Sequence, residues 1–221
     1  MGLLSLLTTD PVVFFITAAI IIMALTIHEY AHAWVADYLG DPTPRYQGRV
    51  SLNPLAHLDP LGTILLFLVG FGWGKPVMFD PHNLRSPKKD IAAIAVAGPI
   101  SNLCLALFFA VIGPVFLYLL PAAASSFTQI IYFGVFYNCM LAIFNLVPVY
   151  PLDGSKIALS LLPKHLAYEY DSLMTNYGMY ILLALIFPWG GQSPISLLIQ
   201  PVIQFVAALY LTLASIIVGL I

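Results

Sequence analysis

The sequence predicts an all-α, polytopic membrane protein with about five transmembrane helices and one re-entrant or β-hairpin element between the first and the second. Of its 221 residues, 61% are hydrophobic and only 8% are charged, and the mean hydropathy of +0.95 lies far above that of soluble domains. The apolar residues form long runs without period-two alternation. Because lipid offers no partner to backbone amides, such runs favour a helical bundle over a barrel.

Five segments reach or approach the roughly 20 apolar residues that cross a bilayer: residues 11–38, 91–120, 127–149, 177–189 and 195–221. A cleaved signal peptide begins with basic residues, and residues 1–10 contain no Lys or Arg. We therefore expect the first segment to be retained as a helix. We treat 1–221 as a single membrane domain, with its core motifs in 11–160 and additional helices in 173–221.

The more polar stretch 41–90 contains one short apolar run, Leu61–Phe71. Loops on the cytoplasmic side of a membrane carry the excess of Lys and Arg. If Leu61–Phe71 does not cross, all basic residues face the cytoplasm; if it does cross, this asymmetry is lost. We therefore expect a re-entrant or interfacial run, with β-prone residues 49–52 and 75–79 as hairpin edges. The basic residues are Arg45, Arg49, Lys75, Arg85, Lys88, Lys89, Lys156 and Lys164.

The pattern His28-Glu29-Tyr30-Ala31-His32 contains the groups of a hydrolytic metal site. Residues four apart leave the same face of a helix one turn apart, so both imidazoles can hold one ion. Glu29 lies about 100° further round and can reach a metal-bound water instead. A metal lowers the pKa of its bound water, and the carboxylate accepts the proton and later passes it to the leaving amine.

A pattern with three defined positions also occurs by chance, so its surroundings decide its value. The preceding run Val12–Ile27 has no ionisable residue, and the chain contains only two glutamates, Glu29 and Glu169. A charge at the bilayer centre costs about 2.5–3.5 kcal/mol on insertion scales. An intramembrane His-Glu-His cluster is therefore interpreted as functional.

Catalytic zinc takes three protein ligands, so one more is needed. Asp153 is the best candidate, because it follows a long apolar segment in a stretch where Pro148 and Pro151 break the helix and Gly154 permits an unusual turn. The alternative is an interfacial Asp that caps a helix beginning near Ser155. Spacing alone leaves these two interpretations evenly matched.

Three motifs in this order resemble the site-2 protease family of intramembrane zinc proteases. They are His28-Glu29-xx-His32, Gly98-Pro99-xx-Asn102 and Asn145-xx-Pro148-xx-Pro151-x-Asp153-Gly154. The combination is specific, although the first motif alone is not. The resemblance covers about residues 11–160 and is closest to small prokaryotic members that lack a PDZ domain and nucleotide-sensing repeats.

The resemblance implies that His28, His32 and Asp153 bind one Zn²⁺ per chain and that Glu29 is the general base. Asn145 would help to hold the substrate or stabilise the oxyanion. Asn102 is a second candidate for this role, although a polar residue near a Gly-Pro element also serves packing or capping.

The family cleaves transmembrane segments of other membrane proteins within the lipid bilayer, near the cytoplasmic face and often after an earlier protease has cut the substrate. This implies a multi-pass protein of the cell membrane, and the predicted topology places the motif residues toward the cytoplasm. No basic cluster with interleaved aromatics suggests nucleic acid.

The segment 47–62, followed by Trp73-Gly-Lys-Pro, resembles the subgroup's membrane-dipping β element, which presents substrate as an extended strand. Within it, His57 and Asp59 suggest a second metal. A turn beside Pro60, stabilised by a His-Asp hydrogen bond, explains the pair equally simply and is the interpretation that we favour.

Two other functions fit the same residues. A metal or proton transporter also carries intramembrane His and carboxylate groups, but such proteins often show paired halves, and no internal repeat is visible here. A non-cleaving pseudoprotease would bind membrane helices without cutting them. The presence of Glu29 and of all three candidate ligands argues against it.

Overall fold

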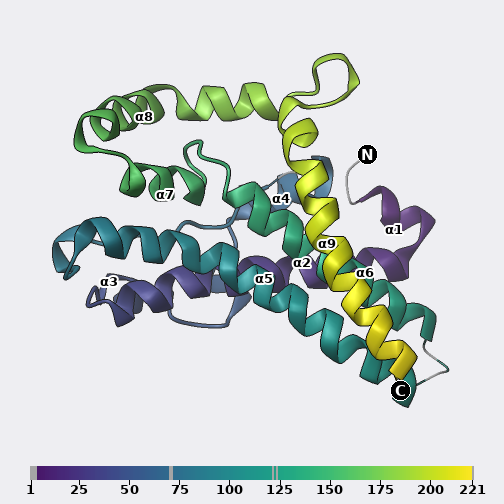
Figure 1. The fold of residues 1–221 in the computed structure, drawn as a ribbon. Helices are drawn as coiled ribbons and strands as arrows, with labels where there is room; N and C mark the ends of the chain where they lie inside the picture. Colours follow the sequence, from purple (N-terminus) through teal and green to yellow (C-terminus); the bar gives the residue numbers. More distant parts are fainter. Residues whose placement is uncertain (1–3, 70–71, 121, 123, 221) are drawn as a thin grey trace.

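A computed structural model describes residues 4–69, 72–120, 122 and 124–220, and the described part consists of helices and connecting loops (Figure 1). The elements are α1 (Ser5–Thr9), α2 (Pro11–Tyr38), α3 (Thr43–Tyr46), η1 (Pro54–Ala56), α4 (Pro60–Val69), η2 (Pro81–Asn83), α5 (Pro87–Leu119), α6 (Ala124–Asn145), α7 (Asp153–Leu161), α8 (Lys164–Ile186), η4 (Trp189–Gly191) and α9 (Pro194–Leu220).

Four helical segments in the described residues are long and apolar enough to cross a membrane: Pro11–Tyr38, Pro87–Leu119, Phe127–Asn145 and Trp189–Leu220. The predicted all-α, polytopic membrane fold is confirmed. The four spans are one fewer than the five predicted segments. Predicted segment 177–189 is mainly the second half of α8, and the first half of that helix carries Lys164, Glu169 and Asp171.

The spans pack through a mixture of alanines and larger apolar side chains. Helix α9 lies across α5 and α6, and the end of α5 and the start of α6 lie near the C-terminus (Figure 1). In lipid there is no hydrophobic driving force between helices, so they associate through van der Waals contacts. Glycine and alanine strengthen these contacts because they let the backbones approach closely. The cluster at these crossings is formed by Ile20, Ala106, Phe109, Ala110, Ile131, Val135, Cys139, Ala207 and Ala214.

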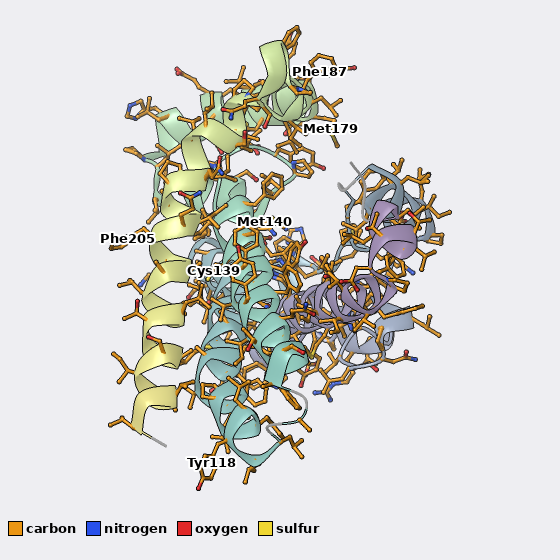
Figure 2. All side chains as sticks on the ribbon, turned by 90° about the vertical axis from the view of Figure 1, so that its right-hand side faces the viewer. Tyr118, Cys139, Met140, Met179, Phe187 and Phe205 are labelled. Atoms are coloured by element: carbon orange, nitrogen blue, oxygen red, sulfur yellow. The ribbon has the colours of Figure 1, made fainter. Side chains whose placement is uncertain are left out.

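The outer faces of the spans carry large apolar side chains. Phe205 on α9 points away from the bundle (Figure 2) and is 65% exposed, and Phe15 on α2 is 64% exposed. Such exposure on several helices would be a liability in water, whereas lipid is as apolar as the side chains themselves. The bundle therefore presents a lipid-facing surface around a core that combines alanines with larger apolar side chains.

The element between α2 and α5 is only partly as predicted. Helix α4 has 10 residues, about 15 Å at 1.5 Å per residue, which is half of the roughly 30 Å hydrocarbon core. This supports a run that does not cross; residues 70 and 71 of the predicted run lie outside the described part. Within that part the predicted hairpin does not form, because residues 49–52 and 75–79 are not in strands. One isolated bridge, between Leu58 and Gly74, lies just outside both segments.

The end of α2 is tied to the loop before α5 by Asp41. The helix ends before Gly40, whose φ of +113° favours glycine. The buried Asp41 carboxylate accepts hydrogen bonds from the backbone and hydroxyl groups of Thr43, from Asp80 N at 2.7 Å and from Asn83 Nδ2 at 2.9 Å. Burial raises the pKa of Asp41, but these four bonds outweigh burial and hold it below its ordinary value.

Candidate metal centre

Three side chains from distant parts of the chain converge inside the bundle. Nε2 of His28 and Nε2 of His32 lie 3.1 Å apart, and Asp153 Oδ2 is 3.1 Å from each of them. All three residues are buried. Among the residues that the structure describes, they form the one group of three or more His, Cys, Asp or Glu side chains placed to share an ion.

Local structure explains how Asp153 reaches the two histidines on α2. Helix α6 ends at Asn145, and α7 begins at Asp153 after a short turn. A Cβ at Gly154 would lie 2.3 Å from Leu146 O and 2.4 Å from Val147 O, so this tight turn requires glycine. The turn brings the start of α7 back against the end of α6, which aims the Asp153 carboxylate at the histidines.

Each imidazole is oriented through its other nitrogen. His28 Nδ1 lies 2.6 Å from Asn102 Oδ1, and His32 Nδ1 lies 2.7 Å from the carbonyl oxygen of Ile94. Both oxygens are acceptors, so each ring donates its Nδ1 hydrogen and keeps a lone pair on Nε2. A second hydrogen bond of this kind is typical of metal-binding histidines.

The donor set fits a zinc ion. Two imidazole lone pairs and one carboxylate oxygen converge with no hydrogen among them in this tautomer, and such an arrangement of acceptors needs protons or a cation. Zinc–ligand distances of about 2.0–2.1 Å give a tetrahedron with edges of about 3.3 Å, close to the observed 3.1 Å separations.

Gly98 on α5 lies directly against the two imidazoles. A Cβ at this position would be 2.4 Å from His32 Nε2 and 2.6 Å from His28 Nε2. Nothing larger than hydrogen fits there, because carbon atoms normally keep about 3.5 Å from their neighbours. The sequence pattern drew attention to Gly98 and Pro99, but only the helix crossing shows that the glycine makes room for the site.

Glu29 lies beside the loop that precedes α4. Arg49 is buried, with its Nη2 3.7 Å from Glu29 Oε2, and its guanidinium also donates to the carbonyl oxygens of Ala56 and Lys75. A Cβ built on Gly74 would lie 3.2 Å from Glu29 Oε1. The Glu29 carboxylate thus lies between the buried Arg49 guanidinium on one side and the backbone at Gly74, in the loop after α4, on the other.

His57 and Asp59 do not form a second metal site in the described residues. His57 is fully buried, and its Nε2 donates to Ser51 O at 2.6 Å. Burial lowers the pKa of His57, which favours the neutral ring. Asp59 Oδ1 accepts from Gly62 N at 2.8 Å at the start of α4. Both residues stabilise the loop, as the turn interpretation predicts, although the predicted His-Asp hydrogen bond is replaced by these backbone contacts.

The asparagines have different surroundings. Asn102 is fully buried, and its Nδ2 donates to Ala24 O and to Asn138 Oδ1, so both amide hydrogens are used and the side chain supports His28 from behind. Asn145 donates to Leu141 O within α6, and its predicted role at the substrate stays a prediction. Asn138, equally buried, was not singled out from the sequence, because a lone Asn in an apolar run carries no motif.

A polytopic helical fold in which two histidines and a carboxylate converge at one buried centre, beside a glutamate, is the arrangement expected of an integral-membrane metallopeptidase. Comparison of the sequence with known proteins indicates the same class. The sequence model of peptidase family M50 matches residues 110–187. "Putative zinc metalloprotease YwhC" of Bacillus subtilis is 37% identical over 176 residues, which cover 77% of this chain and 80% of that relative.

Two further relatives match this chain over little more than half of their own length. "Putative zinc metalloprotease Rip2" of Mycolicibacterium smegmatis is 32% identical over 64% of this chain and 55% of its own length. Stage IV sporulation protein FB of Bacillus subtilis is 27% identical over 66% of this chain and 51% of its own length. No solved structure matches. This chain belongs to peptidase family M50, the site-2 type of intramembrane protease, and its cofactor is zinc.

Proposed function

We propose that this protein hydrolyses peptide bonds within transmembrane segments of other membrane proteins, near the cytoplasmic side of the cell membrane. In this proposal His28, His32 and Asp153 hold the zinc ion and Glu29 is the general base. The observation that carries the assignment is the buried triangle of three acceptor atoms, one from each of His28, His32 and Asp153, which lie 3.1 Å from one another. Glu29 directly follows the first of these histidines in the sequence.

The side chains divide the work of amide hydrolysis. Zinc, when bound, acts as a Lewis acid and lowers the pKa of a water molecule. Glu29 takes a proton from the attacking water and delivers it to the leaving amine. Arg49 holds the Glu29 carboxylate from the loop side, while Asn102 and the Ile94 carbonyl keep the two imidazoles in the metal-binding tautomer.

The charge distribution supports a cytoplasmic active site. All eight Lys and Arg residues lie in 39–89 or 146–186, at the ends or connections of the four spans. If α2 crosses toward the cytoplasm, α5 crosses back and α6 crosses toward the cytoplasm again, then both stretches lie on the same side of the membrane. The positive-inside rule identifies this side as cytoplasmic. His28 and His32 lie late in α2, toward this side. The assignment does not depend on whether α8 crosses.

The substrate must offer an unwound peptide bond. Amides within a membrane helix are hydrogen-bonded and shielded, so we expect segments that contain Gly, Pro or Asn to be cleaved in preference to stable helices. An earlier cut by another protease would supply substrates with little mass outside the membrane. A polyleucine segment cleaved as readily as one with a helix breaker would refute this preference.

The decisive experiment measures zinc content and cleavage together. Wild-type protein and the Glu29→Gln variant are purified in detergent and assayed with a reporter transmembrane substrate. We expect Glu29→Gln to retain one zinc per chain and lose cleavage by at least about 100-fold, since general acid–base catalysis contributes 10²–10⁴-fold. Glu169, the other glutamate, is exposed on α8, and Glu169→Gln is the matched control.

A second pair of variants tests the third zinc ligand, and Glu29→Gln also tests the transporter alternative. Asp153→Ala is expected to lose zinc, whereas Asp171→Ala, an exposed position on α8, keeps it. Zinc bound at wild-type affinity by Asp153→Ala would exclude Asp153 as the third ligand. Metal flux into liposomes that survives Glu29→Gln would instead indicate a transporter.

A further inference from the structure

A second candidate site, a cavity bordered by lysines, lies away from the metal centre, between the starts of α5 and α8 and the helix α7. A cavity of about 270 Å³ there is lined by Lys88, Lys156 and Lys164, with apolar walls from Ile91, Leu159 and Ala167. No carboxylate lines it. The volume lies near the lower end of the range for small-molecule pockets, so it suits a compact group.

The three lysines lack anionic partners. Lys88 Nζ donates to the Leu162 carbonyl oxygen at 3.0 Å, and Lys156 Nζ lies 5.6 Å from the ring centre of Phe79. In the part of the chain that the structure describes, no Asp or Glu forms an ion pair with any of them. Three like charges around one cavity repel each other, and this repulsion is relieved when an anion binds between them.

The place of the cavity in the fold indicates which anion it meets. Lys88 is the second residue of α5, a membrane span, and lies three residues before the start of its apolar run at Ile91, so the cavity lies at the polar end of this span. Lipid phosphates occupy this level, and basic pockets between transmembrane helices bind anionic headgroups. The apolar walls suit the adjoining glycerol and the first methylenes of acyl chains.

We propose that this cavity binds the phosphate group of an anionic phospholipid. A free phosphate ion has the same chemistry, and the experiment below distinguishes the two sources. A bound headgroup would bridge the helices that support the metal centre, because Lys156 follows Asp153 on α7 and Lys88 precedes Ile94 on α5. Binding does not depend on whether the protein cleaves membrane segments, so this proposal stands apart from the proposed function.

The test uses the full-length, zinc-loaded protein in a neutral detergent. Dihexanoyl phosphatidylglycerol, dihexanoyl phosphatidylcholine and inorganic phosphate are each titrated, and binding is followed by microscale thermophoresis. The site variant is Lys156→Gln/Lys164→Gln. The matched control, Arg85→Gln/Lys89→Gln, also removes two positive charges near the start of α5, from exposed residues that do not line the cavity. Thermal unfolding of both variants verifies that they fold.

We expect saturable binding of phosphatidylglycerol and none of phosphatidylcholine. The site variant should bind phosphatidylglycerol roughly 10- to 30-fold more weakly, given the usual contribution of a lysine near an anionic headgroup, while the control stays within about twofold of wild type. Equal weakening in both variants would overturn the site in favour of diffuse surface charge. Inorganic phosphate bound as tightly as phosphatidylglycerol would overturn the lipid assignment and make free phosphate the ligand.

Discussion

Replacing Gly98 by alanine tests how the metal centre is built. The new methyl carbon would lie 2.4 Å from His32 Nε2 and 2.6 Å from both Nε2 and Cε1 of His28. Normal contact is about 3.5 Å, so the overlap is about 1 Å with each ring. Because the methyl group also takes up space between the two donor nitrogens, we expect zinc affinity to fall by at least about 100-fold, the upper end of the range for changes around metal ligands.

Two controls separate this effect from general destabilisation. Gly219→Ala on α9 meets no atom within 4 Å and should be neutral or slightly stabilising, since alanine is the better helix former. Gly113→Ala would place its Cβ 2.2 Å from Ile131 Cγ1, a clash in the core away from the metal centre. This variant should lower the unfolding temperature and keep its zinc.

The assay is equilibrium zinc binding by competition with a chromophoric chelator, with thermal unfolding recorded on the same samples. The expected pattern is loss of zinc by Gly98→Ala alone. Wild-type zinc affinity in Gly98→Ala would refute the placement of Gly98 against the imidazoles. Zinc loss by Gly113→Ala to the same extent would show that instability, not crowding of the site, empties the centre.

Other substitutions test single contacts. Asn102→Leu removes the acceptor that orients His28, and zinc affinity should fall about 10- to 100-fold in the chelator assay. Arg49→Met removes the cation beside Glu29, so cleavage by zinc-loaded protein should fall about tenfold or more. Arg45→Met, at an exposed position, should leave cleavage unchanged. Equal losses in the two variants would contradict the role of Arg49. Asp41→Asn should cost about 1–3 kcal/mol at pH 7. Because folding depresses the pKa of Asp41, this difference should be fully present above the unfolded pKa of about 3.9 and be lost progressively as the pH falls through the lower folded-state pKa. Thermal unfolding should therefore show a smaller difference at pH 3 than at pH 7.

Local patterns predicted the membrane class, most of the helices and two histidines placed to share a metal ion. Helical periodicity acts over a few residues, so the spacing of His28 and His32 alone places both side chains on one face. One expectation, the β-hairpin, failed. Short β-prone stretches do not make a hairpin without cross-strand partners, and here the loop backbone bonds to Arg49 instead. Predicted segment 177–189 continues a helix whose first half is polar, and this helix is not among the four spans found in the described residues.

The amino-acid sequence by itself determined that this protein lives in a membrane, that α2 carries His28, Glu29 and His32, and that Asp153 is a candidate third ligand. Only the tertiary structure decided that Asp153, 125 residues from His28, reaches both imidazoles. It also revealed the space at Gly98 and the cation at Arg49. The reason is physical: helix periodicity is set by neighbouring residues, whereas contacts between helices depend on how entire faces pack.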